Sequence, residues 1–241
     1  MHLTGRNITN KLRASLDDWL PPVVRDSAIF RLAVRLWLGP NAIPDFKCRA
    51  FDMSDEAFAK AYRDLGGLYT ERPSDTTEAQ AEWILANIGQ ENASVLEIGP
   101  GAGYLTKRLR DAGHSVTELE LSVNTDSANR IQGTLERLPF PDKSFDVVIL
   151  AHVLEHARSL TRAFLHLERV SKGRVLIVTP KQRFYKWTFD YHLHFFYSVE
   201  HLGSHIHKGQ AHGSEINGDL CLVWDVAAGL SNGPGGRMQS D

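Results

Sequence analysis

The stretch VLEIGPGAGYLT, residues 95–106, constrains the fold more than any other part of this chain. Its pattern predicts a short buried strand over residues 95–98, then a turn with Gly99, Gly101 and Gly103, and then a helix. Glycine lets a ligand approach the backbone closely, because no Cβ intervenes and a positive φ is accessible. The unpaired N–H groups at the start of the helix point at such a ligand. The stretch therefore predicts a cofactor site built from a strand, a loop and a helix.

The spacing of the glycines narrows the choice of cofactor. A dinucleotide-binding loop has the pattern G-x-G-x-x-G, and a phosphate-binding P-loop ends in Gly-Lys-Ser/Thr. In this chain the third glycine, Gly103, comes one residue early, Tyr104 follows it, and the Gly-Lys-Ser/Thr ending is missing. Neither pattern therefore applies, and a glycine-rich turn without a ligand remains the alternative at this point.

A second strand with an acid near its end follows the predicted helix. Gly113 marks the end of the helix, because glycine is the usual residue just past a helix C-terminus. Residues 115–121, SVTELEL, then predict a strand that carries Glu120. An acid about 20 residues beyond a glycine loop is placed to accept hydrogen bonds from ribose hydroxyls. This spacing favours a cofactor that contains a ribose.

Residues 131–157 read IQGTLERLPFPDKSFDVVILAHVLEHA. Together with the E-x-G-x-G-x-G pattern of residues 97–103, this segment resembles the type 11 branch of the class I S-adenosylmethionine-dependent methyltransferases. In that branch a G-D-A-E-x-L-P-F-x-D-x-S-F-D-x-V pattern is followed by H-V-L-E-H. The resemblance implies an α/β fold with a Rossmann-like, seven-stranded, mostly parallel sheet and helices on both faces. It also implies S-adenosylmethionine as the cofactor.

The same resemblance implies which residues contact the cofactor. They lie in the glycine loop and at the ends of the strands that follow: Glu97, Gly99 and Gly101 at the methionine half, Glu120 at the ribose diol, Leu121 on adenine, Thr134 and Leu135 at the adenine edge, and Ala151 and His152 near the methionine moiety and the sulfonium. The family often has Asp at the position of Thr134, and a threonine hydroxyl is a weaker acceptor for the adenine amino group. Leu138 and Phe140, in the same segment, are expected to pack in the core.

The chain divides near residue 75 into an N-terminal helical extension, residues 1–74, and a methyltransferase domain, residues 75–230. Asp75 is the expected N-cap of the first helix of the domain, with a glutamate three residues later. Strands and helices then alternate, which implies a parallel sheet with ligands at the carboxyl ends of the strands. The last strand is expected over residues 219–226. Residues 231–241, rich in glycine and polar residues, are expected to be a disordered tail.

The extension contains two apolar helical patterns, over residues 8–20 and 27–38, and a third helix near residues 54–65. Two interpretations of the first two helices remain open. They form a cap over the active site, which is the favoured interpretation, or they bring the enzyme to a membrane surface as a peripheral contact. Tyr69 and Arg72 are weaker candidates for contacting the carboxylate of the cofactor.

Three histidines are candidate bases for the acceptor: His152 after the fourth strand, and His192 and His194 in the aromatic segment of residues 179–196. A histidine is the natural base if the acceptor is a hydroxyl, because its pKa lies near neutrality. Structural roles are the alternative, since H-V-L-E-H recurs in members with different substrates and the segment could be a packed lid. Six histidines fall within residues 192–212, but their spacing matches no metal signature, so no metal is expected.

Composition sets broader limits. The formal net charge of −2 argues against a nucleic-acid footprint, and residues 150–153, LAHV, lack the Asn/Asp-Pro-Pro-Tyr/Phe motif of nucleic-acid amino methyltransferases. The two cysteines, the polar start of the chain and the lack of a long apolar run favour a cytoplasmic protein. We therefore expect methyl transfer to a hydroxyl of a small molecule or glycan. Alternatives are N- or C-methylation of a metabolite or a quinone-like lipid ring, or a non-catalytic cofactor-binding protein. The oligomeric state is left open.

Overall fold

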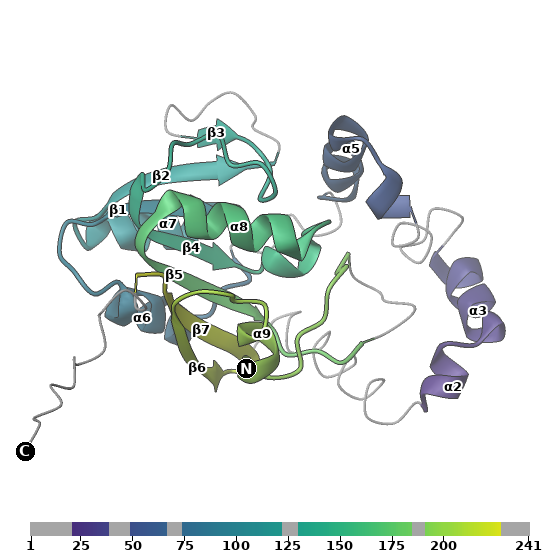
Figure 1. Ribbon diagram of the computed structural model, residues 1–241. Helices are drawn as coiled ribbons and strands as arrows, with labels where there is room; N and C mark the ends of the chain where they lie inside the picture. The colour runs from purple at the N-terminus through teal and green to yellow at the C-terminus, as the bar shows by residue number, and fades with distance from the viewer. Residues whose placement is uncertain (1–20, 39–48, 67–73, 122–129, 185–190, 228–241) are drawn as a thin grey trace, which may run out of the picture. The chain divides into compact units, whose positions relative to one another are not determined.

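The structure is a computed structural model that describes residues 21–38, 49–66, 74–121, 130–184 and 191–227 (Figure 1). The chain groups into two compact units. One unit comprises Met1–Asp52 and Phe184–His192, and the other comprises Met53–Arg183 and Leu193–Asp241. The boundary near residue 75 and the tail over residues 231–241 stay predictions.

The first unit contains two described α-helices, α2 (Pro22–Arg25) and α3 (Ala28–Leu38), and a 3-10 helix, η1 (Ala50–Asp52). The helix expected over residues 27–38 is confirmed by α3, and the Ser27 hydroxyl caps it by accepting a hydrogen bond from the backbone N–H of Phe30 at 3.1 Å. The helix expected over residues 8–20 lies outside the described residues. None of the described helices is long and apolar enough to cross a membrane.

The second unit begins with α5 (Asp55–Gly66) and α6 (Glu78–Asn87). The expected N-cap of α6, Asp75, was wrong. Thr77 is the cap: its hydroxyl accepts from the N–H of Gln80, and the Gln80 side chain accepts from the N–H of Thr77 at 2.8 Å. Because this capping box closes two residues further along the chain, the helix starts later than predicted.

A seven-stranded sheet forms the centre of this unit, in the order β3-β2-β1-β4-β5-β7-β6 (Figure 1). The first five strands in this order pair in parallel, and β7 pairs antiparallel with both β5 and β6, so the predicted mostly parallel sheet is confirmed. The strands are β1 (Ser94–Ile98), β2 (Ser115–Glu120), β3 (Arg130–Gln132), β4 (Phe145–Ala151), β5 (Ser171–Pro180), β6 (Gln210–Ile216) and β7 (Asp219–Asp225).

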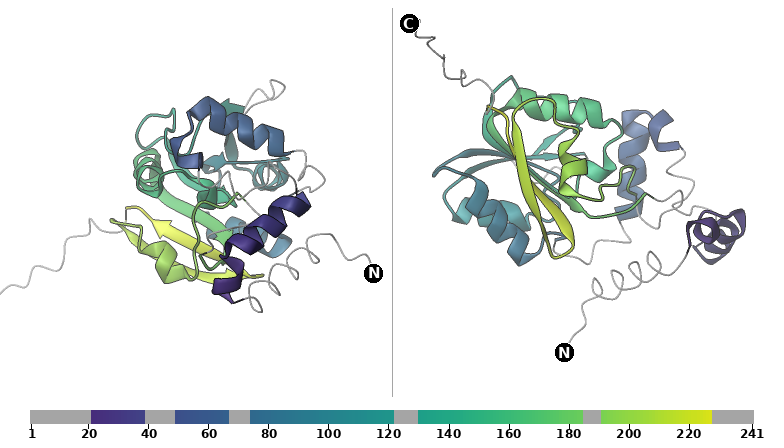
Figure 2. Two further views of the ribbon diagram at one scale, coloured as in Figure 1. Left: turned by 90° about the vertical axis from the view of Figure 1, so that its right-hand side faces the viewer. Right: turned by 60° about the horizontal axis from the view of Figure 1, so that its bottom comes forward.

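Helices cover both faces of the sheet, as expected (Figure 2, right). On one face, α6 and α7 (Tyr104–Asp111) pack on one apolar cluster, and on the other face α8 (Leu160–Val170) and α9 (Val199–Gly203) pack on a second. Successive residues of β5 belong to opposite clusters, because side chains alternate between the two faces of a strand: Val175 lies in the α8-side cluster and Leu176 in the α6-side cluster. Leu138 is buried in the α8-side cluster and Phe140 packs against it, which confirms the expected core roles of these two residues.

The predicted sheet had seven strands, but no residue range was predicted for β6. Every residue from Gln210 to Glu215 is exposed, so the segment lacks the alternation that marks a half-buried strand. The pair Asn217 and Gly218 links β6 to β7 with φ values of 55° and 86°. Asn-Gly is the residue pair that favours such a hairpin turn, and it was the available signal for this strand.

Candidate active site

The glycine loop lies at the carboxyl end of β1, beside the end of β2. The backbone N–H of Gly99 donates to the carbonyl of Leu119 at 2.8 Å, and Gly99 has a φ of 70°. A Cβ at this position would lie 2.4 Å from a methyl carbon of Val153, so the close approach as well as the φ requires glycine. Gly101 and Gly103 also have positive φ, but no atom lies within 4 Å of the Cβ position of either. The loop therefore presents an open, Cβ-free edge just before α7 begins.

The carboxyl group of Glu120 reaches this loop from the end of β2. One of its oxygens accepts from the N–H of Leu121 at 2.9 Å. Burial raises the pKa of Glu120, and the hydrogen bonds from the backbone N–H groups of Leu121 and Gly101 partly offset that effect. An acid thus stands against the open edge of the loop, where the sequence predicted an acceptor for a ribose diol.

Glu97 points from β1 to the first turn of α7. It is buried, and it accepts a hydrogen bond from the Thr106 hydroxyl at 2.5 Å. Burial raises the pKa of Glu97 to about 7, although the hydrogen bond from Thr106 acts in the opposite direction. The contact ties the strand to the helix on either side of the glycine loop, and the predicted contact with the methionine half stays a prediction.

A buried acid on β2, Glu118, supports the outer side of the loop. Arg110 of α7 and Arg130 of β3 each form an ion pair with it, at 2.8 and 2.7 Å. Arg130 also donates to the carbonyl of Gly101 at 3.2 Å. Through these ion pairs and the bond to Gly101, the cluster supports the backbone of the loop from outside.

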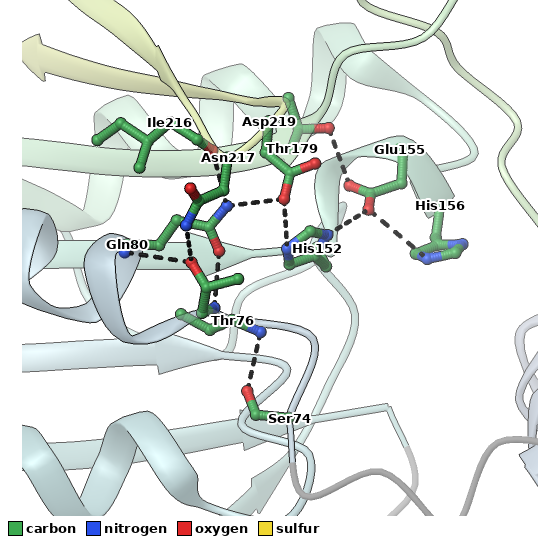
Figure 3. Close-up of polar contacts among 11 residues, drawn as sticks. Ser74, Thr76, Gln80, His152, Glu155, His156, Thr179, Ile216, Asn217 and Asp219 are labelled. Atoms are coloured by element: carbon green, nitrogen blue, oxygen red, sulfur yellow. Dashed lines mark hydrogen bonds and ion pairs between the residues drawn. The ribbon is translucent and has the colours of Figure 1, made fainter. Parts of the chain in front are cut away.

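The end of β4 carries Ala151 and His152. His152 has a φ of 57°, a left-handed conformation that is uncommon for residues other than glycine, while its N–H donates to the carbonyl of Val178 at 2.9 Å. Nε2 of its ring lies 3.4 Å from a carboxylate oxygen of Asp219, and Nδ1 lies 3.8 Å from one of Glu155 (Figure 3). The ring is thus held between two acids, one at the start of β7 and one in η2 (Leu154–His156).

Further polar groups hold these two acids (Figure 3). The Gln80 amide donates to Asp219 at 2.7 Å and to the carbonyl of Ile216 at 3.2 Å. The Thr179 hydroxyl donates to the second carboxylate oxygen of Glu155 at 3.1 Å. His156 lies at the edge of this group, with Nε2 4.0 Å from Glu155. Residues from α6, the end of β4, η2, β5 and β7 therefore meet at one edge of the sheet.

The remaining predicted residues are less constrained by described contacts. Leu121 and Thr134 are half-buried, and Leu135 is buried in the core. Thr134 also lines a cavity of about 380 Å³ beside the start of α8. The roles of these residues at adenine stay predictions.

The predicted histidines of the acceptor segment fall in different units. His192 is buried and belongs to the first unit, whereas His194 belongs to the second, where its N–H donates to the carbonyl of Glu155 at 3.0 Å. The candidate role of these two histidines as bases stays a prediction. Tyr69 and Arg72 lie outside the described residues.

Sequence reasoning missed Gln80 and Asp219. Gln80 stands at the third position of α6, where a Thr-x-x-Gln capping box was readable, and Asp219 follows the Asn-Gly turn. Neither local pattern predicts that Gln80 contacts Asp219, because 139 positions separate the two residues along the chain.

The site fits a nucleoside cofactor such as S-adenosylmethionine. The open edge at Gly101 and Gly103 admits a ligand close to the backbone, and Glu120 stands next to it as a hydrogen-bond acceptor. Carboxylates suit a ribose diol or an ammonium group, whereas they repel a pyrophosphate. The fold and the site therefore define a Rossmann-like α/β protein that binds a nucleoside cofactor.

Comparison with known families identifies the class further. Residues 96–178, about a third of the chain, match the family described as "Methyltransferase domain". The chain contains a class I S-adenosylmethionine-dependent methyltransferase domain, as the motifs predicted, and S-adenosylmethionine is the cofactor of this class.

Individual relatives cover only part of the chain. A malonyl-[acyl-carrier protein] O-methyltransferase from Erwinia pyrifoliae is 31% identical over 143 residues, which are 55% of this chain and 54% of the relative. A ubiquinone/menaquinone biosynthesis C-methyltransferase from Hahella chejuensis is 32% identical over 36% of this chain and 42% of the relative. The chain thus spans about half the length of the curated relatives it matches, or less. A solved S-adenosylmethionine-dependent methyltransferase from Aquifex aeolicus aligns with a TM-score of 0.48 at 17% identity, covering 60% of this chain and 88% of that one.

Proposed function

We propose that this protein transfers the methyl group of S-adenosylmethionine to a hydroxyl oxygen of a small-molecule or glycan acceptor. The observation that carries the proposal is the open glycine loop with Glu120 against it, at the same sheet edge as the polar group around His152. When bound, the cofactor supplies an electrophilic methyl group on a sulfonium. The protein's part is then to orient the acceptor, to exclude water and to receive a proton.

On the donor side we assign the methionine half of the cofactor to Glu97, Gly99 and Gly101. Glu120 accepts from the ribose diol, because its carboxyl group already faces the loop. Adenine lies against Leu121, with its edge at Thr134 and Leu135. The positions of Ala151 and His152 at the carboxyl end of β4 support a place beside the methionine moiety and the sulfonium.

On the acceptor side we propose a histidine as the base. His192 and His194 follow β5 in the sequence, and in open α/β sheets acceptors meet the cofactor at the carboxyl ends of the strands. The backbone bond from His194 to Glu155 supports a place for His194 beside η2. An O-methyltransferase among the relatives supports oxygen as the acceptor atom. We propose neither a metal nor a nucleic acid as part of this reaction.

A second candidate function is C-methylation of a quinone-like lipid ring. The named C-methyltransferase relative supports it, and so does α3, where Ile29, Leu32 and Leu36 follow helical spacing and are exposed. Such a face suits a peripheral contact between a cytoplasmic enzyme and a membrane. Co-sedimentation with anionic lipid vesicles tests this contact. Binding by the wild type that is lost in Leu32→Asp/Leu36→Asp would support it, and no binding by the wild type would remove it.

A labelled-methyl experiment tests the proposed function. Purified protein is incubated with deuteromethyl S-adenosylmethionine and a small-molecule and glycan extract, and mass spectrometry locates the label. We expect label on oxygen in the polar fraction, whereas label on carbon in the lipid fraction would favour the second candidate. If no label is transferred and calorimetry detects no binding of S-adenosylhomocysteine, both proposals fail. Binding without transfer would favour the non-catalytic alternative.

A further inference from the structure

The ring of His152 faces a carboxylate with each of its nitrogens, at 3.4 Å to Asp219 and 3.8 Å to Glu155 (Figure 3). A neutral imidazole carries one N–H and one lone pair, so it can donate to only one of two acids. Its lone pair would then face the other carboxylate, which is repulsive. With a proton on each nitrogen, the ring can donate to both carboxylates.

Burial acts on the charged ring in two directions: desolvation disfavours the imidazolium, and weak screening strengthens its attraction to the two carboxylates. The side chains of Glu155, Asp219 and His152 are 2%, 10% and 12% exposed. Charges in such surroundings are weakly screened by water, so the attraction between an imidazolium and two carboxylates is larger than at the surface.

The two acids are themselves held in place. The Gln80 amide donates to the same oxygen of Asp219 that faces His152, and the Thr179 hydroxyl donates to the oxygen of Glu155 that faces away from His152. Described titratable groups next to the acids include His156, whose Nε2 lies 4.0 Å from Glu155, and Cys221, a buried thiol on the same strand as Asp219. His152 is the residue whose ring faces both carboxylates.

We propose that His152 is an imidazolium link between Glu155 and Asp219, and that it acts as a positioning residue and not as the base for the acceptor. The link holds the left-handed turn at the end of β4, since the His152 side chain is anchored on both sides. Gln80 is a second positioning residue, because it fixes Asp219. This inference refines the proposed function: the proton of the acceptor goes to a histidine other than His152.

Nitrogen-15 NMR of the full chain with labelled histidine tests the link without needing an acceptor. His152→Gln assigns the His152 signals. We expect both ring nitrogens of His152 to be protonated at pH 7, with a titration midpoint above the ordinary value of about 6.5. Asp219→Asn removes one of the two carboxylates, and we expect it to lower that midpoint by about one pH unit.

Asp225→Asn is the matched control, because Asp225 lies at the other end of β7, where it pairs with Arg174 at 2.7 Å. It should leave the His152 signals unchanged. A neutral His152 ring in the wild type at pH 7 would overturn the proposal, even if Asp219→Asn does not fold. An equal shift in both variants would overturn it too. S-adenosylhomocysteine binding, measured on the same samples, reports separately on the proposed function.

Discussion

The donor half and the acceptor half of the site are built in different ways. The donor half consists of the glycine loop and Glu120, which lie within one strand–loop–helix–strand segment, residues 94–120. The polar group that we call the acceptor half joins Gln80, His152 and Asp219, from α6, the end of β4 and β7. The glycine loop and Glu120 are thus arranged by one local segment, whereas the acceptor half exists only once the whole sheet has formed.

The two halves also differ in how much room they leave. No atom lies within 4 Å of a Cβ position at Gly101 or Gly103, so the donor half is open. In the acceptor half, Glu155 and Asp219 already have several partners. Substitutions at open positions of the donor half, such as Glu120, should therefore mainly change affinity for the cofactor. Substitutions at packed positions in either half should mainly change stability and protonation.

The largest loss of stability is expected from Gly99→Ala. The added methyl would collide with Val153 and a positive φ would be forced on alanine, so the free energy of unfolding should fall by about 3 kcal/mol. Gly101→Ala is the matched control, with a similar φ and open space, and should cost about 1 kcal/mol. Urea denaturation compares the two. Equal losses would show that the contact with Val153 is unimportant.

Gln80→Ala should destabilise the protein by about 2 kcal/mol, because both the capping box and the bonds to β7 are lost. Affinity for S-adenosylhomocysteine should stay within about twofold, because Gln80 lies outside the donor half. Glu82→Ala, on the exposed side of α6, is the control for both measurements. A large loss of affinity in Gln80→Ala would break the separation of the two halves.

Glu97 should make stability depend on pH. Burial raises its pKa in the folded state to about 7, above the ordinary 4.5, so the folded protein holds this proton more tightly than the unfolded chain. The contribution of this proton to the free energy of unfolding is fully present below pH 4.5. It is lost as the pH rises from 4.5 to 7, by up to about 1.4 kcal/mol per pH unit.

Glu97→Gln should flatten this slope, since the glutamine amide stays neutral and its oxygen can still accept from Thr106. Urea midpoints of both proteins between pH 4.5 and 8 test the expectation. Glu91→Gln, at an exposed position before β1, should keep the slope of the wild type. Parallel profiles for the wild type and Glu97→Gln would contradict the assignment.

The smallest effect on free energy is expected from Glu120→Ala. Loss of the acceptor for the ribose diol should weaken S-adenosylhomocysteine binding about tenfold, which is about 1.4 kcal/mol. Asp111→Ala, an exposed acid on α7, should leave affinity unchanged in the same calorimetric titration. If Glu120→Ala bound as tightly as the wild type, the ribose assignment would be refuted.

Sequence reasoning predicted the strands and the glycine turn that frame the donor half because their signals are local. The glycine spacing, the acid of β2 and the alternating strands and helices can all be read within short windows. Strands β1, β2 and β7 are confirmed close to their predicted bounds. Strands β3 and β6 were missed because one has three residues and the other is almost fully exposed.

The acceptor half could not be read in the same way. The bond between Gln80 and Asp219 joins residues 139 positions apart, and no periodic pattern encodes such a pairing. The prediction of His152 as a candidate base rested on its position after β4. The structure confirms this position. The direction of its two ring nitrogens depends on β7 and η2, and these contacts appear only in three dimensions.

The position of β7 between β5 and β6 has a consequence for the order of folding. β7 is the last strand of the sheet to be synthesised, yet it supplies Asp219, which α6 binds through Gln80 from the start of the domain. Helix α6 must therefore await the last strand of the sheet before it can form this contact. A nascent chain that has completed β1 to β5 already contains the glycine loop and Glu120, but it lacks a carboxylate for Nε2 of His152.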